Sequence, residues 1–230
     1  MPDAMDVELF RRFSLFAELD PPELEAIAAV AKARRYKRDE VIFYADEIGD
    51  VFCLIRKGKV KITMISPEGK EIILSLLGPG EFFGEMALLD DEPRSATVIA
   101  TEELELLTIW RTDFLNIVKD NFSITRKVLA ELSHRLRSAS DRIESLATMD
   151  VQGRLARFFL DLAQRGGKEM EGDYIAVTRP THQSIANMIG TSRETVSRMM
   201  HDWMEQNLLL EEGRTVYLRK RAIAQFKEAV

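Results

Sequence analysis

One arginine stands out in the segment FFGEMALLDDEPRSA, which runs from Phe82 to Ala96. Arg94 follows an acidic run, and a Gly-Glu pair at Gly84 and Glu85 lies near the start of the segment. Two kinds of chemistry fit an arginine in such a place. It can pair with the neighbouring carboxylates and close a surface turn, or it can bind an anion through charge-assisted hydrogen bonds. The residues by themselves leave both interpretations open.

A second stretch, THQSIANMIGTSRETVSRMMHDWMEQNLL, predicts two helices joined by a turn at Gly190. Thr191-x-x-Glu194 has the spacing of a capping box that opens the second helix. The apolar residues at helical spacing are Ile185, Ala186 and Ile189 in the first helix and Val196, Met199, Met200 and Trp203 in the second. This pattern is typical of a helix-turn-helix.

The outward positions of the second helix carry side chains that can read DNA, namely Arg193, Glu194, Ser197 and Arg198. Arg can form two hydrogen bonds with guanine, and Glu can accept one from cytosine N4. Phosphate contacts, which set the register without reading sequence, are assigned to Thr181, Gln183 and Thr195. The alternative for the arginines is a solvated helix face. The agreement of turn, caps and apolar pattern favours base contact.

A narrow apolar stripe precedes this stretch. Its residues are spaced 3, 4, 3, 4 and 3 apart, and they are Leu129, Leu132, Leu136, Ala139, Ile143 and Leu146. Such a/d spacing is typical of a coiled-coil seam and predicts a homodimer. The alternative is a long helix that lies on its own domain, which usually requires a wider apolar face.

The remaining patterns predict an α+β chain in three parts. Short helices with Asp20 as a cap lead into an antiparallel β-barrel of jelly-roll type, because short apolar runs alternate with turn signals over residues 41–110. The run KVKITMI alternates from Lys59 to Ile65, and the lone Cys53 is expected in the core. We expect bounds of 1–122 for this domain, 123–149 for the dimerisation helix and 150–230 for a winged helix-turn-helix that ends in the hairpin EEGRTVYLR.

Composition limits the function classes. The 230 residues carry a net charge of -6, but from residue 150 onward 12 Lys/Arg balance 11 Asp/Glu, so DNA contact is expected from this part. One cysteine cannot form a disulfide framework or an all-cysteine cluster, and the three histidines lie outside the strands, which argues against haem or metal there. We find no catalytic pairing and expect no enzyme. No apolar run spans a bilayer and the N-terminus is acidic, so we expect a cytoplasmic protein without a membrane partner.

The segments GTSRETVSR, FFGEMALLDDEPRSATV and DVQGRLA together resemble the cyclic-AMP receptor protein/FNR family of bacterial transcription regulators over nearly the whole chain. The resemblance implies a homodimer that binds double-stranded DNA at a palindromic operator, with half-sites similar to TGTGA, and that contacts RNA polymerase. It also implies a cyclic nucleotide or similar phosphate-bearing effector in the barrel domain, with no covalent cofactor. The alternative is an effector-independent factor of the same fold with a vestigial pocket.

By the same resemblance, Gly84 and Glu85 begin a short helix at an effector pocket that also includes Met86. Glu85 is expected to bind the ribose hydroxyl, and Arg94 and Ser95 are expected to bind the phosphate. The base would meet a pair of residues on the long helix, which are Ala139 and Ser140 where cyclic-AMP-binding members have Thr-Ser. Ala139 removes one hydrogen bond of about 1 kcal/mol, so cyclic AMP, cyclic GMP, a cyclic dinucleotide or no ligand all remain open.

Overall fold

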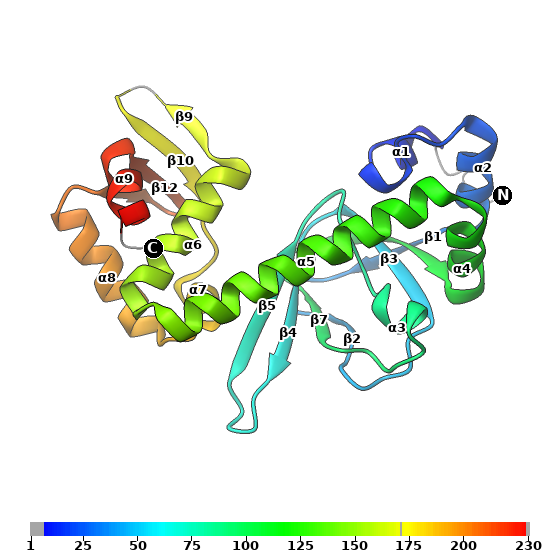
Figure 1. Ribbon diagram of the computed structural model, residues 1–230, viewed down its shortest axis with the longest axis horizontal. Helices are drawn as coiled ribbons and strands as arrows, with labels where there is room; N and C mark the ends of the chain where they lie inside the picture. Colours follow the sequence, from blue (N-terminus) through cyan, green and yellow to red (C-terminus); the bar gives the residue numbers. More distant parts are fainter. Residues whose placement is uncertain (1–6, 171, 229–230) are drawn as a thin grey trace. The chain divides into compact units, whose positions relative to one another are not determined.

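The computed structural model describes residues 7–170 and 172–228 (Figure 1). The chain packs as two compact units that divide between Leu136 and Arg137, inside one long helix. Residues 1–6, which belong to the acidic N-terminus noted above, lie outside the described residues. No helix of the described residues has both the length and the apolarity needed to cross a bilayer.

The first unit begins with short helices: α1 (Val7–Arg11), the 3-10 turn η1 (Ser14–Phe16) and α2 (Pro21–Val30). Asp20 caps α2 as predicted, because its carboxylate accepts a hydrogen bond from the Glu23 N–H at 2.9 Å. The Glu23 carboxylate accepts in return from the Asp20 N–H, which completes a capping box.

The predicted jelly-roll domain consists of two antiparallel four-stranded sheets. Their orders are β1-β8-β3-β6 and β2-β7-β4-β5. The strands are β1 (Lys32–Tyr36), β2 (Val41–Phe43), β3 (Val51–Lys57), β4 (Val60–Ile65), β5 (Glu71–Leu77), β6 (Phe82–Phe83), β7 (Thr97–Ala100) and β8 (Leu104–Trp110). The predicted strands begin at residue 41 and do not include β1. Its sequence KARRY is charged and mostly exposed, so it carries no apolar signal.

The middle strands of the first sheet, β3 and β8, are mostly buried on both faces. Cys53 and Ile55 of β3 pack in the cluster that lies between the two sheets, as expected for Cys53. Phe52 and Leu54 of the same strand point to the other face, where the helices of this unit pack. This arrangement explains why β3 reads as a continuous apolar run rather than an alternating one.

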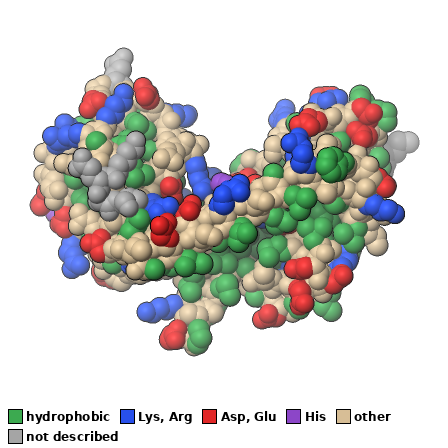
Figure 2. Space-filling model, viewed as in Figure 1, with side chains coloured by type: hydrophobic (Ala, Val, Ile, Leu, Met, Phe, Trp, Pro, Cys, Tyr) green, Lys and Arg blue, Asp and Glu red, His purple; other side chains and the backbone are tan. Residues whose placement is uncertain are grey.

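The predicted alternation of KVKITMI is wrong in its second half. The pairing of β4 with β5 shifts register between Ile62 and Thr63, because β5 has one extra residue, Leu74, at this place. Beyond the shift Thr63 is buried, and its hydroxyl donates to the Ile72 carbonyl at 3.0 Å, whereas Met64 and Ile65 are 46 % and 62 % exposed. Ile65 is one of the apolar side chains exposed on the first unit, and Figure 2 shows apolar side chains among charged ones on the viewed face.

Two helices follow the strands, α4 (Arg111–Asp120) and α5 (Phe122–Thr148). The first turns of α5 pack against the first unit, where Ile124 and Val128 are fully buried and Leu132 is partly buried. α5 begins close to the predicted start of a dimerisation helix. The three-part division of the chain stays a prediction.

The second unit has the predicted order of a winged helix-turn-helix. Its elements after α5 are α6 (Val151–Gly166), β9 (Lys168–Met170), β10 (Tyr174–Thr178), α7 (His182–Ile189), α8 (Arg193–Glu205), β11 (Leu209–Glu212), β12 (Thr215–Arg219) and α9 (Lys220–Glu228). Asp150 caps α6 by accepting from the Gly153 N–H at 2.8 Å. The strands form one antiparallel sheet of order β11-β12-β10-β9, and the β11–β12 hairpin is called the wing below.

Candidate functional site

The segment from Phe82 to Ala96 forms a compact cassette around the short helix α3 (Met86–Leu89). The chain turns sharply at Gly84, whose φ of +85° suits glycine. A Cβ at this position would lie 2.8 Å from Arg94 Nη1, so a larger residue would displace the arginine. Glu85 is the N-cap of α3, in agreement with the expectation that Gly84 and Glu85 begin a helix.

Arg94 points into the cassette and is only 4 % exposed. Its Nη1 donates to the Gly84 carbonyl at 2.7 Å and its Nη2 to the Val51 carbonyl at 2.8 Å, while its Cζ lies 4.1 Å from the centre of the Phe43 ring. Within the described residues Arg94 forms no ion pair with the acidic run, whose Asp91 pairs instead with Arg111. The surface-turn interpretation of Arg94 is therefore wrong.

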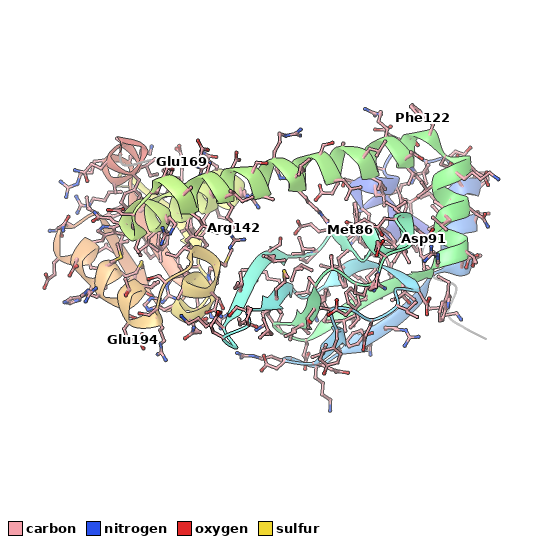
Figure 3. All side chains as sticks on the ribbon, turned by 60° about the horizontal axis from the view of Figure 1, so that its bottom comes forward. Met86, Asp91, Phe122, Arg142, Glu169 and Glu194 are labelled. Atoms are coloured by element: carbon pink, nitrogen blue, oxygen red, sulfur yellow. The ribbon has the colours of Figure 1, made fainter. Side chains whose placement is uncertain are left out.

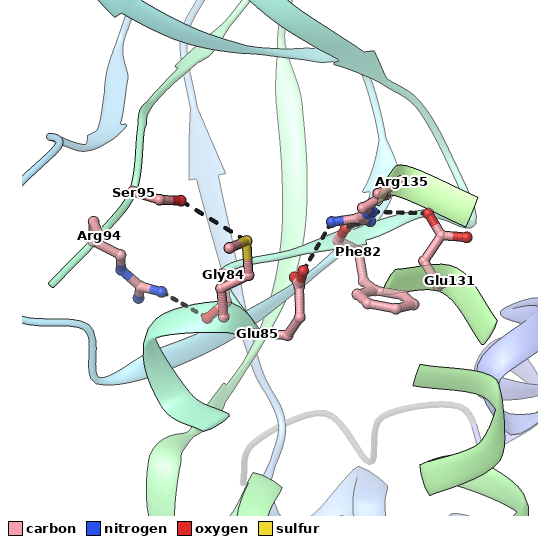
Figure 4. A network of polar contacts seen from close by, with 8 residues as sticks. Phe82, Gly84, Glu85, Arg94, Ser95, Glu131 and Arg135 are labelled. Atoms are coloured by element: carbon pink, nitrogen blue, oxygen red, sulfur yellow. Dashed lines mark hydrogen bonds and ion pairs between the residues drawn. The ribbon is translucent and has the colours of Figure 1, made fainter. Parts of the chain in front are cut away.

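Glu85 is the second buried charge of the cassette, and it is 1 % exposed. Its Oε1 accepts from Arg135 Nη1 at 3.0 Å, and Arg135 also donates to the Phe82 carbonyl at 2.6 Å and to Glu131 at 2.8 Å (Figure 4). Burial raises the pKa of Glu85 above its ordinary value, and the charge of Arg135 opposes that rise. Arg135 thus ties the start of α3 to α5.

Each of these two buried side chains keeps one polar atom without a partner. Within the described residues only four buried side-chain nitrogen or oxygen atoms lack a hydrogen bond, and two of them are Arg94 Nε and Glu85 Oε2. Such atoms are rare in folded proteins because each carries a desolvation penalty of about 1–3 kcal/mol. A donor and an acceptor of this kind in one cassette suit a ligand that has both an anionic oxygen and a hydroxyl group.

The other predicted effector residues lie in more open positions. Met86 is 46 % exposed, and the exposed Ser95 places its hydroxyl 3.9 Å from the Met86 sulfur. Ala139 and Ser140 are exposed on α5, beyond the division between the units. Their contact with a base stays a prediction.

Arg135 was missed by the sequence analysis, because it lies in the charged stretch SHRLRS and resembles its solvated neighbours. One signal could have identified it. Arg135 precedes Ala139 by four residues, and residues four apart lie on the same face of a helix. The face that was assigned to the effector therefore includes Arg135.

The apolar stripe of α5 divides into two parts. Leu132 packs partly against the core of its own unit, whereas Leu129, Ile143 and Leu146 are 58 %, 68 % and 50 % exposed. A row of exposed apolar side chains at a/d spacing is typical of a helix that pairs with another helix. The exposed part of the stripe supports the predicted seam.

The second helix of the helix-turn-helix begins at the predicted place, but its cap differs. Gly190 adopts the left-handed conformation with φ of +71° and ends α7. Ser192, rather than Thr191, caps α8, since its hydroxyl accepts from the Thr195 N–H at 3.1 Å. The predicted capping box of Thr191 and Glu194 is therefore wrong.

Three of the predicted base-reading residues are exposed on the first turns of α8: Arg193, Glu194 and Arg198 (Glu194 is labelled in Figure 3). Hydrogen bonds from its own backbone and from Ser192 lower the pKa of Glu194, which keeps it an anionic acceptor. Ser197 differs from the prediction. It is half-buried, and its hydroxyl lies 2.8 Å from Nδ1 of His182, because it faces α7 rather than solvent.

The predicted phosphate contacts have local partners. Thr181 caps α7 by accepting from the Ser184 N–H at 3.1 Å, and Gln183 donates to Asn187 at 2.8 Å on an exposed face. The Thr195 hydroxyl lies 3.0 Å from the Ser192 hydroxyl. Thr181 and Gln183 are exposed at the start of α7, whereas Thr195 is half-buried.

Two family models match the chain. Residues 33–121 match a cyclic nucleotide-binding domain, and residues 153–225 match a Crp-like helix-turn-helix domain. The first match covers the strands and the cassette, and the second covers the helices and the wing.

Similar proteins extend over nearly the whole chain. The cyclic AMP receptor protein of Thermus thermophilus is 34% identical over 211 residues, which are 92% of this chain and 94% of that protein. A CRP-like cAMP-activated global transcriptional regulator of Mycobacterium tuberculosis is 31% identical over 212 residues, again 92% of this chain and 94% of the relative. The solved structure of the c-di-GMP responsive global regulator CLP of Xanthomonas campestris has a TM-score of 0.72 at 25% identity, and covers 87% of this chain and 99% of that chain.

Gly49, which lies between β2 and β3, packs closely against the Arg94 side chain. A Cβ on Gly49 would lie 2.7 Å from the Ala87 Cβ and 2.9 Å from the Arg94 Cζ. The φ of Gly49 is not in the left-handed region, so the constraint is steric alone. Gly78 offers a matched control, because the nearest atoms to a Cβ there are 3.9 Å away.

We therefore expect Gly49→Ala to destabilise the first unit by about 1–3 kcal/mol, because overpacking displaces Ala87 or the arginine. Gly78→Ala should leave the free energy of unfolding nearly unchanged. Urea unfolding followed by Trp110 fluorescence, in a common Trp203→Phe background, measures both. Equal stability of the two variants would contradict the steric role of Gly49.

Proposed function

Since the chain belongs to the cyclic AMP receptor protein/FNR family of transcription regulators, we propose that it is a homodimer whose affinity for a palindromic operator is set by a cyclic nucleotide in the cassette. The family members named above are regulators rather than enzymes. We further propose that the bound dimer contacts RNA polymerase in the cytoplasm, where its DNA lies.

The observation that carries the proposal is the pair of buried polar atoms without partners, Arg94 Nε and Glu85 Oε2. A cyclic phosphate would pair with the Arg94 guanidinium, whose Nη atoms already hold backbone carbonyls in a fixed orientation. A ribose hydroxyl would donate to Glu85 Oε2 while Arg135 keeps Oε1. Ser95, exposed beside Met86, would add a further hydrogen bond to the phosphate.

The base of the effector is not identified by the cassette. Two relatives are named for cyclic AMP and one solved neighbour for cyclic di-GMP. We assign the base contact to Ala139 and Ser140 of α5, where the missing hydroxyl of Ala139 removes one adenine-selective hydrogen bond. Cyclic AMP, cyclic GMP and cyclic di-GMP are therefore all candidates. An effector-independent factor with a vestigial pocket is the competing proposal.

Transmission to the DNA-binding part would follow α5. Arg135 connects this helix to the cassette in the first unit through Glu85. In the second unit Arg142 of the same helix donates to the Met188 carbonyl at the end of α7 (Arg142 is labelled in Figure 3). A ligand shifts such a system only if its affinity for the two states differs. We propose that the state favoured by the ligand places the α8 helices of both protomers, called the recognition helices below, in successive major grooves.

The dimer would form through the exposed part of the α5 stripe. We expect Leu129→Asp combined with Ile143→Asp to yield monomers in analytical ultracentrifugation, because two buried charges in the seam lack partners. Leu132 is unsuitable for this test, since it also packs in its own unit. Ala130→Asp with Ala147→Asp adds the same charges at exposed positions outside the stripe and should leave the dimer intact. A dimer that persists in the first variant would count against the seam.

Effector binding tests the role of Arg94. Calorimetry should detect binding of cyclic AMP, cyclic GMP or cyclic di-GMP to the wild-type chain. Arg94→Lys should weaken it by about 10-fold to 100-fold, because Lys keeps the charge but cannot hold two carbonyls and a phosphate together. Arg111→Lys is the matched control, since Arg111 lies beside α3 and pairs with exposed Asp91. Binding of none of the three nucleotides by the wild type would favour the effector-independent proposal.

DNA reading is tested by selection from a random library. A two-fold dimer should select half-sites whose centres lie about 34 Å apart, one turn of the DNA helix. Arg198→Ala should flatten the preference at one base pair of each half-site, with a loss of about 1–3 kcal/mol of discrimination. Gln183→Ala should weaken binding to all sequences about equally. An Arg198→Ala motif as sharp as that of the wild type would refute base reading by this residue.

A further inference from the structure

The two remaining buried polar atoms without a partner lie together in the second unit. They are Arg179 Nε and His182 Nε2. Both side chains face Glu211 of the wing: Arg179 pairs with its Oε1, and His182 Nε2 lies 3.9 Å from the same oxygen. None of these residues was assigned a function above.

His182 contacts the recognition helix α8. It is the first residue of α7, and its Nδ1 lies 2.8 Å from the Ser197 hydroxyl of α8. Ser197 immediately precedes Arg198 and lies four residues after Arg193, in the same part of the helix as the proposed reading residues. His182 therefore contacts the part of α8 that carries the proposed reading residues.

Arg179 binds the wing. Besides its ion pair with Glu211, its Nη2 donates to the Gly213 carbonyl at 3.2 Å and its backbone N–H donates to the Arg214 carbonyl at 2.9 Å. The side chains of Arg179 and Glu211 are 11 % and 15 % exposed, so the pair is well shielded from solvent. The turn of the wing is thus held to the segment that leads into α7.

His182 is the point at which these two sets of contacts meet. Burial lowers the pKa of His182, and the charges of Arg179 and Arg193 lower it further, so the ring is neutral at pH 7. A neutral ring has one donor and one acceptor nitrogen, and a hydroxyl can take either role toward Nδ1. If Nδ1 accepts from Ser197, the ring proton is on Nε2 and faces the Glu211 carboxylate.

We propose that His182 is a positioning residue that joins the wing to the recognition helix, with Ser197 on Nδ1 and Glu211 on Nε2. The present separation of 3.9 Å is too long for a hydrogen bond. A shift of roughly 1 Å would bring it into the usual range and give the buried Nε2 its partner. Operator binding, which engages the recognition helix, would favour that closed arrangement. The inference rests on the proposed DNA-binding function.

A double-mutant cycle on operator affinity tests the connection. Ser197 and Glu211 share no contact with each other in the described structure, so Ser197→Ala and Glu211→Gln should act independently unless His182 couples them. We expect their combined effect on operator affinity, measured by fluorescence anisotropy with the full chain, to depart from the product of the single effects by about threefold or more. In a His182→Leu background the same two changes should combine multiplicatively.

Controls separate this role from loss of fold. On a scrambled duplex of equal length the two changes should combine multiplicatively, and circular dichroism should show unchanged helix content. If His182→Leu does not fold, His182→Gln serves instead, because an amide at that length can reach Glu211 but not Ser197 at the same time. His201→Leu, on the exposed side of α8, should leave the coupling unchanged.

Two results would overturn the inference. Multiplicative effects in the wild-type background would show that Ser197 and Glu211 are not coupled, and equal coupling with and without His182 would show that the connection does not pass through it. Failure of the wild-type chain to prefer its selected operator over the scrambled duplex is a different result. That outcome would overturn the proposed function, and the inference with it.

Discussion

The confinement of the Arg94 guanidinium is the constraint on which the cassette depends. The carbonyls of Gly84 and Val51 accept hydrogen bonds from its two Nη atoms. The Phe43 ring lies against the guanidinium, and Gly49 has no Cβ that would contact it. A buried cation is tolerable only if most of its N–H groups have acceptors, and within the described residues backbone carbonyls accept from both Nη atoms of Arg94, while its Nε keeps no partner. The charge therefore stays available to an anion. The glycines are required by the same packing, because a Cβ at either position would meet the arginine.

α5 has several roles, and its residues divide accordingly. The first turns pack into the core of the first unit through Ile124 and Val128, and Arg135 on the same helix holds the buried Glu85. Farther along, Arg142 reaches the end of α7 in the second unit. A continuous helix transmits displacement because its backbone hydrogen bonds resist local bending. We therefore propose α5 as the route between the effector site and the recognition helix.

Within the described residues, buried side-chain polar atoms that lack partners lie in two places, and we have proposed a function for each. In the cassette, Glu85 and Arg94 each have one such atom, which we propose that a ligand binds, and near the wing His182 has one that faces Glu211. Elsewhere in the described residues the buried polar side chains are satisfied, as packing energetics favour. Incomplete hydrogen bonding is unfavourable in the free chain, so it persists where a second state or a ligand can complete it.

The sequence by itself determined the features that arise within a few residues: the caps at Asp20 and Asp150, the turn at Gly190 and the apolar faces of α7 and α8. Periodicity and capping act locally and can be read along the chain. Only the tertiary structure decided the partners of Arg94 and Arg135, since Val51 and Glu85 lie 43 and 50 residues away from them. Strand register controls such contacts, and one extra residue, like Leu74 of β5, changes which residues of two strands lie opposite each other. No local pattern encodes that register, because it is set by the packing of whole sheets.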